Sequence, residues 1–319
     1  MIARARPSPA SARPAAAGPF ALALSLSLAL GALVAPAAGA AGSGYWLLGG
    51  DGGVFSYGVA FAGSAASDPT LCPPNTSDRL LPDGTCWSIA ATPDGKGYWI
   101  LNGDALKVYP FGDATFYGDP APQESSAPRD LWPVARAIVP TSTGHGYWVL
   151  TVPLSGAGRI LPFGDAGWFG DTQTLVAEGY QGFNGMPAGM AATPDGKGYW
   201  EVHSDGGVFA FGDAGYFGSM ASHPLNQPVV GMAATPDGKG YWWVAADGGV
   251  FAFGDAVFGG SMAGTALAAP VVGMARNPAG PGYWLAASDG GLFALGGAPY
   301  LGSMAGLPLA RPIFAVAPG

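Results

Sequence analysis

The chain alternates between short apolar runs and compact groups of turn-forming residues. Between 228 and 262 the runs PVVGMAA, GYWWVA, VFAFG and VFGGSM are separated by TPDGK, ADGG and DA. Runs this short, rich in β-branched and aromatic residues and bounded by Gly, Pro and Asp, predict strands rather than helices. We therefore expect four strand-and-turn segments here, at 228–238, 239–249, 250–256 and 257–262.

The motif Gly-Tyr-Trp marks a repeat that runs through the chain. It occurs six times, at Tyr45-Trp46, Tyr98-Trp99, Tyr147-Trp148, Tyr199-Trp200, Tyr241-Trp242 and Tyr283-Trp284. Successive Tyr residues are 53, 49, 52, 42 and 42 positions apart, and the two equal intervals define the basic unit. A four-stranded repeat of this length is typical of β-propellers. The expected fold is all-β, a six-bladed β-propeller with four-stranded blades.

The residue types within one repeat fit this fold. Asp-Gly pairs such as Asp247-Gly248 suit the positive φ values of a tight hairpin. The first segment of each repeat is rich in small residues, such as Gly231, which suits strands crowded around an axis. The recurring Tyr-Trp pairs are better explained as packing between blades than as a ligand cage.

The two ends of the chain complement each other. The first Gly-Tyr-Trp, at Tyr45, has no first strand before it. Pro312 follows Tyr283 by 29 residues, the interval that also separates Pro270 from Tyr241. We therefore expect residues 312–317 to complete the N-terminal blade, so that the C-terminal strand closes the ring.

Composition and charge place the chain outside the cell. Residues 1–40 combine three Arg with an apolar stretch at 20–34 and the sequence Ala38-Gly39-Ala40, the features of a cleavable signal peptide. The mature protein, 41–319, would be a monomer, secreted and either extracellular or associated with the cell surface. Loss of those three Arg takes the formal net charge from −8 to −11, which disfavours nucleic acid and anionic lipid, and no membrane insertion is expected after cleavage.

The only two cysteines, Cys72 and Cys86, flank a turn-rich segment. In an oxidising compartment they should form a disulfide. A metal site is the alternative, but two Cys with no His nearby favour no metal, and no cofactor motif is found.

The repeat itself resembles a known group. The pattern GYW, DGGVFAFGDA and FGS resembles the repeats of secreted proteins of high-GC Gram-positive bacteria, over nearly all of 44–319. The single strand SDGGLFALG, at 288–296, is similar to a strand of the regulator-of-chromosome-condensation propellers, but repeats two and three lack Asp-Gly-Gly, so no binding residues are carried over.

The repeats are irregular at one place. Extra residues follow repeats one, two and three, at 65–86, 119–133 and 171–186, and the Asp-Gly hairpins of repeats two and three are replaced by other sequences. All these changes should lie on one sector of one face, which is where function is expected on a regular scaffold. Neutral drift of surface loops is the alternative. The candidate ligand-binding residues of this sector are Arg79, Asp104, Glu124, Arg129, Asp130, Trp132, Arg159, Glu178, Tyr180 and Phe183.

Other polar residues give no clear catalytic set. Each of the three His, including His203, is expected in a surface or turn position without a carboxylate partner. Glu201 stands where other repeats have an apolar residue, so a buried or channel-facing carboxylate is expected there. The Asp of the recurring FGDA motif, as in Asp213, suits an Asx-type turn better than a calcium site.

Three functions remain open at this point. The favoured one is a non-catalytic binding module for a glycan, a cell-wall component or a protein partner. The second is a glycan hydrolase or lyase that uses carboxylates of the irregular face, among them Asp104, Glu124, Asp130 and Glu178. The third is a purely structural surface module.

Overall fold

The described residues of the protein form six antiparallel sheets of three strands each. The computed structural model describes residues 44–66, 87–124, 133–153, 155–221 and 223–319, without the side chains of 122 and 124. We number the sheets as units one to six, in chain order of their central strands. Such repeated sheets are consistent with a β-propeller-like fold.

Each unit contains a first, a second and a third strand, in that spatial order. Unit one consists of β18 (Ile313–Pro318), β1 (Tyr45–Gly49) and β2 (Val54–Tyr57); unit two of β3 (Trp87–Ala91), β4 (Tyr98–Asn102) and β5 (Lys107–Phe111); unit three of β6 (Val134–Pro140), β7 (Gly146–Val152) and β8 (Arg159–Gly164). Unit four consists of β9 (Pro187–Ala192), β10 (Gly198–His203) and β11 (Val208–Gly212); unit five of β12 (Val229–Ala234), β13 (Gly240–Ala245) and β14 (Val250–Gly254); unit six of β15 (Val271–Arg276), β16 (Tyr283–Ala287) and β17 (Leu292–Leu295).

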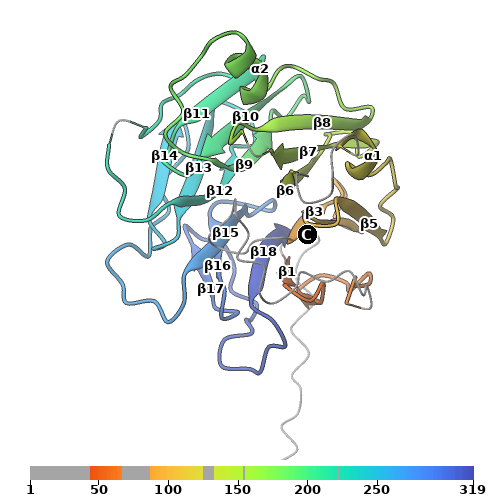
Figure 1. Cartoon of the computed structure of the whole chain (residues 1–319). Coiled ribbons are helices and arrows are strands. Elements are labelled where there is room, and N and C mark those ends of the chain that lie inside the picture. Colours follow the sequence, from red (N-terminus) through yellow and green to blue (C-terminus); the bar gives the residue numbers. More distant parts are fainter. Residues whose placement is uncertain (1–43, 67–86, 125–132, 154, 222) are drawn as a thin grey trace, which may run out of the picture. The chain divides into compact units, whose positions relative to one another are not determined.

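The C-terminal strand completes the N-terminal unit. β18 pairs antiparallel with β1, with Trp46 opposite Ala317 and Leu47 opposite Val316. In Figure 1 the dark blue β18 lies beside the orange β1. The predicted pairing of the tail with the first Gly-Tyr-Trp strand is therefore confirmed.

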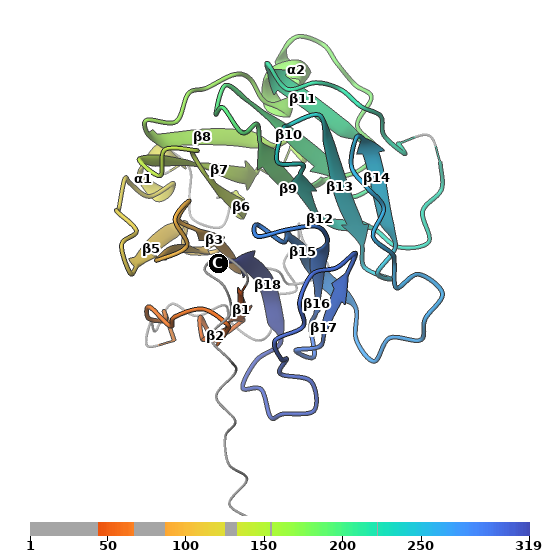
Figure 2. The ribbon, with the colours of Figure 1, turned by 180° about the vertical axis from the view of Figure 1, so that it is seen from behind.

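The first strands of neighbouring units pack against one another. β3 contacts β6, β6 contacts β9, and the series continues through β12 and β15 to β18, which in turn contacts β3. Both views show these strands facing one another (Figures 1 and 2). A Cβ atom on Gly189 would lie 3.5 Å from the Cα atom of Gly231, and one on Gly231 would lie 3.5 Å from that of Gly273. Small residues therefore allow the close approach, as the sequence predicts.

The Tyr-Trp pairs form the core between units. All six Tyr are buried, and each Trp of the motif contacts the Tyr of the next unit, as in Trp200 with Tyr241 (5.7 Å between ring centroids) and Trp284 with Tyr45 (5.1 Å). The assignment of these residues to packing is confirmed.

Among the described residues, the expected fourth strand of each unit is not paired with its sheet. After the third strand, the described chain continues as an extended link segment, such as 213–219 in unit four, without ladder hydrogen bonds to its own sheet. Side chains hold it instead. Trp200 Nε1 donates to the carbonyl of Gly215 (2.6 Å), and the hydroxyl of Tyr241 in unit five donates to the carbonyl of Gly218 (2.6 Å). The fourth segment thus connects two units rather than widening one sheet.

Two short helices lie in the irregular link segments. They are α1 (Ala121–Glu124) and α2 (Thr172–Ala177). Within the described parts of the chain, no helix is long and apolar enough to cross a membrane.

Candidate functional site

A cavity of about 430 Å³ lies between the first strands of all six units. We call it the hairpin-side cavity, because it is lined by the starts of the first strands, at Pro228, Pro270 and Pro312, and by Ala246 and Ser288 beside the hairpins between second and third strands. Antiparallel pairing brings these hairpins to the same face as the end of the described insertion 171–186, which leads into β9. The cavity therefore lies on the face that the sequence marks as irregular.

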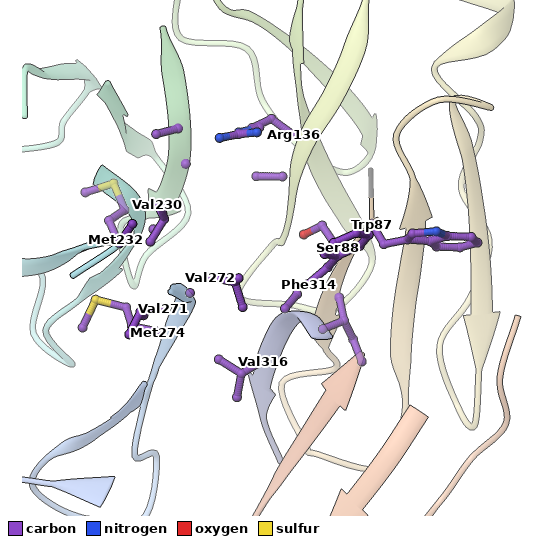
Figure 3. A pocket seen from close by; sticks show the side chains of 18 of the residues that line it. Trp87, Ser88, Arg136, Val230, Met232, Val271, Val272, Met274, Phe314 and Val316 are labelled. Atoms are coloured by element: carbon purple, nitrogen blue, oxygen red, sulfur yellow. The ribbon is translucent and has the colours of Figure 1, made fainter. Parts of the chain in front are cut away.

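The described residues that line this cavity are mostly apolar, and Arg136 is the cation among them. In Figure 3, Val272 and Val316 project into the space between strands, and Arg136 extends into it from β6. The indole of Trp87 points away, toward the ring of Tyr109 (6.3 Å between centroids). An apolar cavity with one charged group at a fixed place is suited to a ligand with an anionic or hydrogen-bond-accepting group.

A second cavity, of about 680 Å³, lies at the other ends of the first strands. We call it the turn-side cavity, because the Thr-Pro-Asp-Gly turns between first and second strands line it. Its Arg276 donates to the carbonyl of Asn277 (3.2 Å), and burial lowers the pKa of its guanidinium. The turn sequence Thr-Pro-Asp-Gly recurs in units two, four and five, whereas units three and six have Thr-Ser-Thr-Gly and Asn-Pro-Ala-Gly.

The predicted site residues divide into described and undescribed ones. Arg79, Arg129, Asp130, Trp132, both cysteines and the side chain of Glu124 lie outside the described residues, as does the signal peptide. Asp104 lies in the turn between β4 and β5, Arg159 begins β8, and Glu178 and Tyr180 are exposed after α2. Tyr180 and Phe183 contact each other (4.8 Å between ring centroids).

The hairpin of unit two is unusual in its backbone. Leu106 is buried and has φ 52°, in the left-handed region where units one and four place Gly52 and Gly206. Asn102 Oδ1 accepts the N–H of Ala105 (3.0 Å) and stabilises the turn. The loss of Asp-Gly is therefore accompanied by a positive φ at a different residue, whose side chain is buried in the core.

The insertion after β8 lies over the buried side chains of Glu201 and His203. Asp171 caps α2 by accepting the N–H of Thr174 (2.8 Å), and its other oxygen accepts the N–H of Ile160 (3.2 Å). Phe183, farther along the insertion, lies against the ring of His203 (5.5 Å between centroids, 24° between planes). The insertion is thus attached to units three and four at both ends.

Glu201 and His203 form a buried pair beneath this insertion. Both side chains are at most 1% exposed, and His203 Nε2 lies 2.8 Å from Glu201 Oε1. The hydroxyl of Thr172 donates to the same oxygen (2.8 Å), whereas Glu201 Oε2 has no hydrogen-bond partner. A Cβ atom on Gly158 would lie 2.4 Å from Glu201 Oε1, so the glycine makes room for the carboxylate.

The geometry fixes one proton of the histidine. His203 Nδ1 lies 2.9 Å from the carbonyl oxygen of Gly185. A carbonyl can only accept, so Nδ1 carries a hydrogen, and the remaining proton is shared between Nε2 and Glu201. The pair is neutral overall in either arrangement, which is how a carboxyl group can stay buried.

The expectation for His203 was wrong. Residues two apart on a strand share a face, so Glu201 and His203, both on β10, point the same way into the interface with unit three. The spacing of two within one strand was the signal in the sequence. The expectation of a buried carboxylate at Glu201 is confirmed.

The recurring FGDA aspartates stabilise turns. Asp165 Oδ1 accepts the hydroxyl of Thr141 (2.8 Å), and Asp113 Oδ1 accepts that of Thr92 (3.1 Å). Each carboxylate thus ties the end of a third strand to the turn between the first and second strands of its unit. This is a structural use of the motif.

In comparisons with known proteins, no protein-family model matches the chain, and no curated protein matches it significantly.

Proposed function

We propose that this chain is a secreted six-bladed β-propeller that serves as a non-catalytic binding module. Its ligand, a glycan, a cell-wall component or a segment of a protein, would bind over the hairpin-side cavity. The six successive sheets, the pairing of β18 with β1 and the contact of β18 with β3 support the propeller architecture. The link segments would take the place of the fourth strand of each blade.

The hairpin-side cavity is the observation that carries this proposal. Its lining comes from secondary structure rather than from loops alone, so it is formed before any ligand arrives. Preformed apolar cavities with few polar groups are the usual form of binding sites. The irregular hairpins and insertions on the same face would supply specificity.

Binding rather than catalysis is favoured by the places of the carboxylates. Asp104 and Glu178 belong to different units, and Asp171 is used in capping α2 and bonding β8. Glu201, with His203, is enclosed under the insertion and belongs to the interface of units three and four. We therefore assign no catalytic residue.

The test uses one arginine from each cavity. The secreted protein is screened on an array of glycans and soluble cell-wall fragments, and the affinity for any ligand found is measured for Arg136→Gln and Arg276→Gln. Arg136→Gln should weaken binding at least about tenfold, since it removes a charge-assisted hydrogen bond. Arg276→Gln, at the turn-side cavity, should bind as the unchanged protein does.

A second variant tests the cavity for the case that the ligand is uncharged and does not bond to Arg136. Val272→Trp places an indole in the hairpin-side cavity and should block binding while melting remains cooperative. Full binding by both Val272→Trp and Arg136→Gln would refute the proposed site. Secretion is checked separately, because protein collected from the medium should begin at residue 41.

A further inference from the structure

An exposed aromatic side chain recurs at one position of all six link segments. These residues are Phe61, Phe116, Trp168, Tyr216, Phe258 and Tyr300, and each is between 49% and 61% exposed. We call them the aromatic positions. They lie on the link segments, away from the residues that line both cavities. An exposed aromatic residue by itself needs no explanation, but six at equivalent places do.

The position is defined by hydrogen bonds of the backbone. In unit four, the residue before Tyr216 is Gly215, whose carbonyl accepts Trp200 Nε1, and the residue after it is Phe217, whose N–H donates to the hydroxyl of Tyr241. In unit six, Pro299 and Leu301 flank Tyr300 and bond in the same way to Trp284 and Tyr45. The backbone is therefore held on both sides of the ring, and the ring is presented in a fixed direction.

The residue types at neighbouring positions show which property is kept. The residue before the aromatic position is Ala, Thr, Gly, Gly, Val and Pro in units one to six, and the residue after it is Ala, Tyr, Phe, Phe, Gly and Leu. The aromatic position itself is Phe, Phe, Trp, Tyr, Phe and Tyr. The repeats have therefore changed at this position only within the aromatic class, although packing does not require it of a half-exposed side chain. An aromatic face open to solvent is the shared property.

The surroundings of the rings indicate what binds them. Tyr216 Oη donates to Ser219 Oγ (3.1 Å), and Tyr300 Oη donates to Ser303 Oγ (3.1 Å), so a hydroxyl pair stands beside an apolar face. A ring with hydroxyl groups at its edge, as in these two units, suits a sugar ring, which offers a face of C–H groups edged by hydroxyls. A protein interface would need a continuous apolar centre. The net charge of −8 disfavours an anionic polymer.

We propose that the aromatic positions are six equivalent subsites for sugar rings of a neutral polysaccharide, one subsite for each unit. Each ring would stack on one sugar, and a chain that reaches neighbouring subsites would gain affinity through its high effective concentration. This proposal uses residues other than those of the hairpin-side cavity and does not depend on that site.

The experiment compares short and long sugars on the full secreted protein. The probes are cellobiose, cellohexaose and chitohexaose. Their binding is measured by calorimetry and by the change in fluorescence of Trp168, an exposed tryptophan. A hexaose that spans two neighbouring subsites should bind at least about tenfold more tightly than the disaccharide. Trp168→Phe should remove the fluorescence change and keep the affinity.

Substitution of the rings separates binding from stability. Tyr216→Ser alone should weaken hexaose binding about two- to fivefold, and Ser at all six positions should weaken it at least about 100-fold. The melting temperature of the single variant should stay within about 2 °C, as for an exposed side chain. Val257→Ser and Leu307→Ser, which change other exposed apolar residues, serve as matched controls and should bind normally.

Three outcomes would overturn the proposal. The first is that neither hexaose binds, and the second is that the variant with Ser at all six positions still binds fully. The third is that the unchanged protein self-associates and this variant does not, because the rings would then contact a second copy of the chain. Arg136→Gln should leave hexaose binding at the aromatic positions intact, so failure of these subsites is distinguishable from failure of the cavity site.

Discussion

Two interfaces between neighbouring units use the same strand position in opposite ways. Between units four and five, Trp243 stands two residues after Tyr241 and stacks on Phe251 (4.1 Å between centroids). Between units three and four, Glu201 stands two residues after Tyr199 and pairs with His203. One interface is apolar and the other polar at equivalent depth.

The link segment above each interface matches what lies beneath it. Met220 and Leu225 of the link after unit four pack against the apolar cluster that contains Trp243. The link after unit three instead supplies the hydroxyl of Thr172 to Glu201 and the carbonyl of Gly185 to His203. The fold thus accepts a buried carboxyl group because a longer link brings the partners that a short link lacks. The insertion at 171–186 is part of the core of that interface.

The largest expected effect comes from breaking the polar pair. His203→Ala leaves the Glu201 carboxyl group buried with Thr172 as its only remaining hydrogen-bond partner, which should lower the free energy of unfolding by about 3–5 kcal/mol. Chemical denaturation measures this change. His145→Ala, an exposed histidine of the turn before β7, is the control and should cost less than about 0.5 kcal/mol. Equal costs for the two variants would show that the pair contributes nothing special.

A second variant converts the polar interface to the apolar kind. Unit six has Leu285 and Ala287 at the positions of Glu201 and His203. The double variant Glu201→Leu with His203→Ala removes both polar groups together, so it should be more stable than the two single costs predict, by about 0.5–3 kcal/mol. A double-mutant cycle by denaturation gives this coupling energy. Strict additivity would contradict the pairing.

A smaller effect is expected from the partner on the link segment. Thr172→Val keeps the shape of the side chain but removes the donor to Glu201 Oε1 and the acceptor for the N–H of Gly158 (2.7 Å). The free energy of unfolding should fall by about 1–3 kcal/mol, the cost of unsatisfied buried groups. Thr265→Val, on an exposed part of the link after unit five, is the matched control and should be neutral. In the Glu201→Leu background, the cost of Thr172→Val should shrink.

The repeat pattern predicts the regular parts of this molecule well. The interval of 29 residues to Pro312 predicts the pairing of β18 with β1, and the repeated Tyr-Trp predicts the core between units. Both predictions depend on backbone periodicity and apolar burial, and the same pattern of both occurs in every repeat. The six Gly-Tyr-Trp motifs likewise predict six sheets, which the structure has.

The sequence is less informative where side chains replace ladder hydrogen bonds. The run VFGGSM at 257–262 looks like a strand, yet Trp242 and Tyr283 hold it through its backbone at Val257 and Gly260. Periodicity reports an extended segment but not its hydrogen-bond partner. His203 was misjudged for a related reason, because its second partner, Gly185, comes from an irregular insertion and uses only its carbonyl.

The smallest effect tests the two interfaces through their tyrosines. Burial raises the pKa of Tyr199 and of Tyr241 from the ordinary value of 10.0 to about 12, and the charges of the nearby Asp171 and Glu201 raise that of Tyr199 alone. Because the folded-state pKa is higher than the unfolded one, the stability from each neutral phenol is fully present below pH 10 and is lost as the pH rises toward about 12.

Tyr199→Phe and Tyr241→Phe should each cost about 1 kcal/mol at pH 7, since each loses one bridging hydroxyl, and each should flatten the fall in stability between pH 10 and 12. Glu201→Leu should lower the pKa of Tyr199, read from tyrosinate absorbance with Tyr199→Phe as the blank, and leave that of Tyr241 unchanged. An equal shift at both tyrosines would mean that the substitution loosens the whole core, and the contrast between the polar and the apolar interface would then be lost.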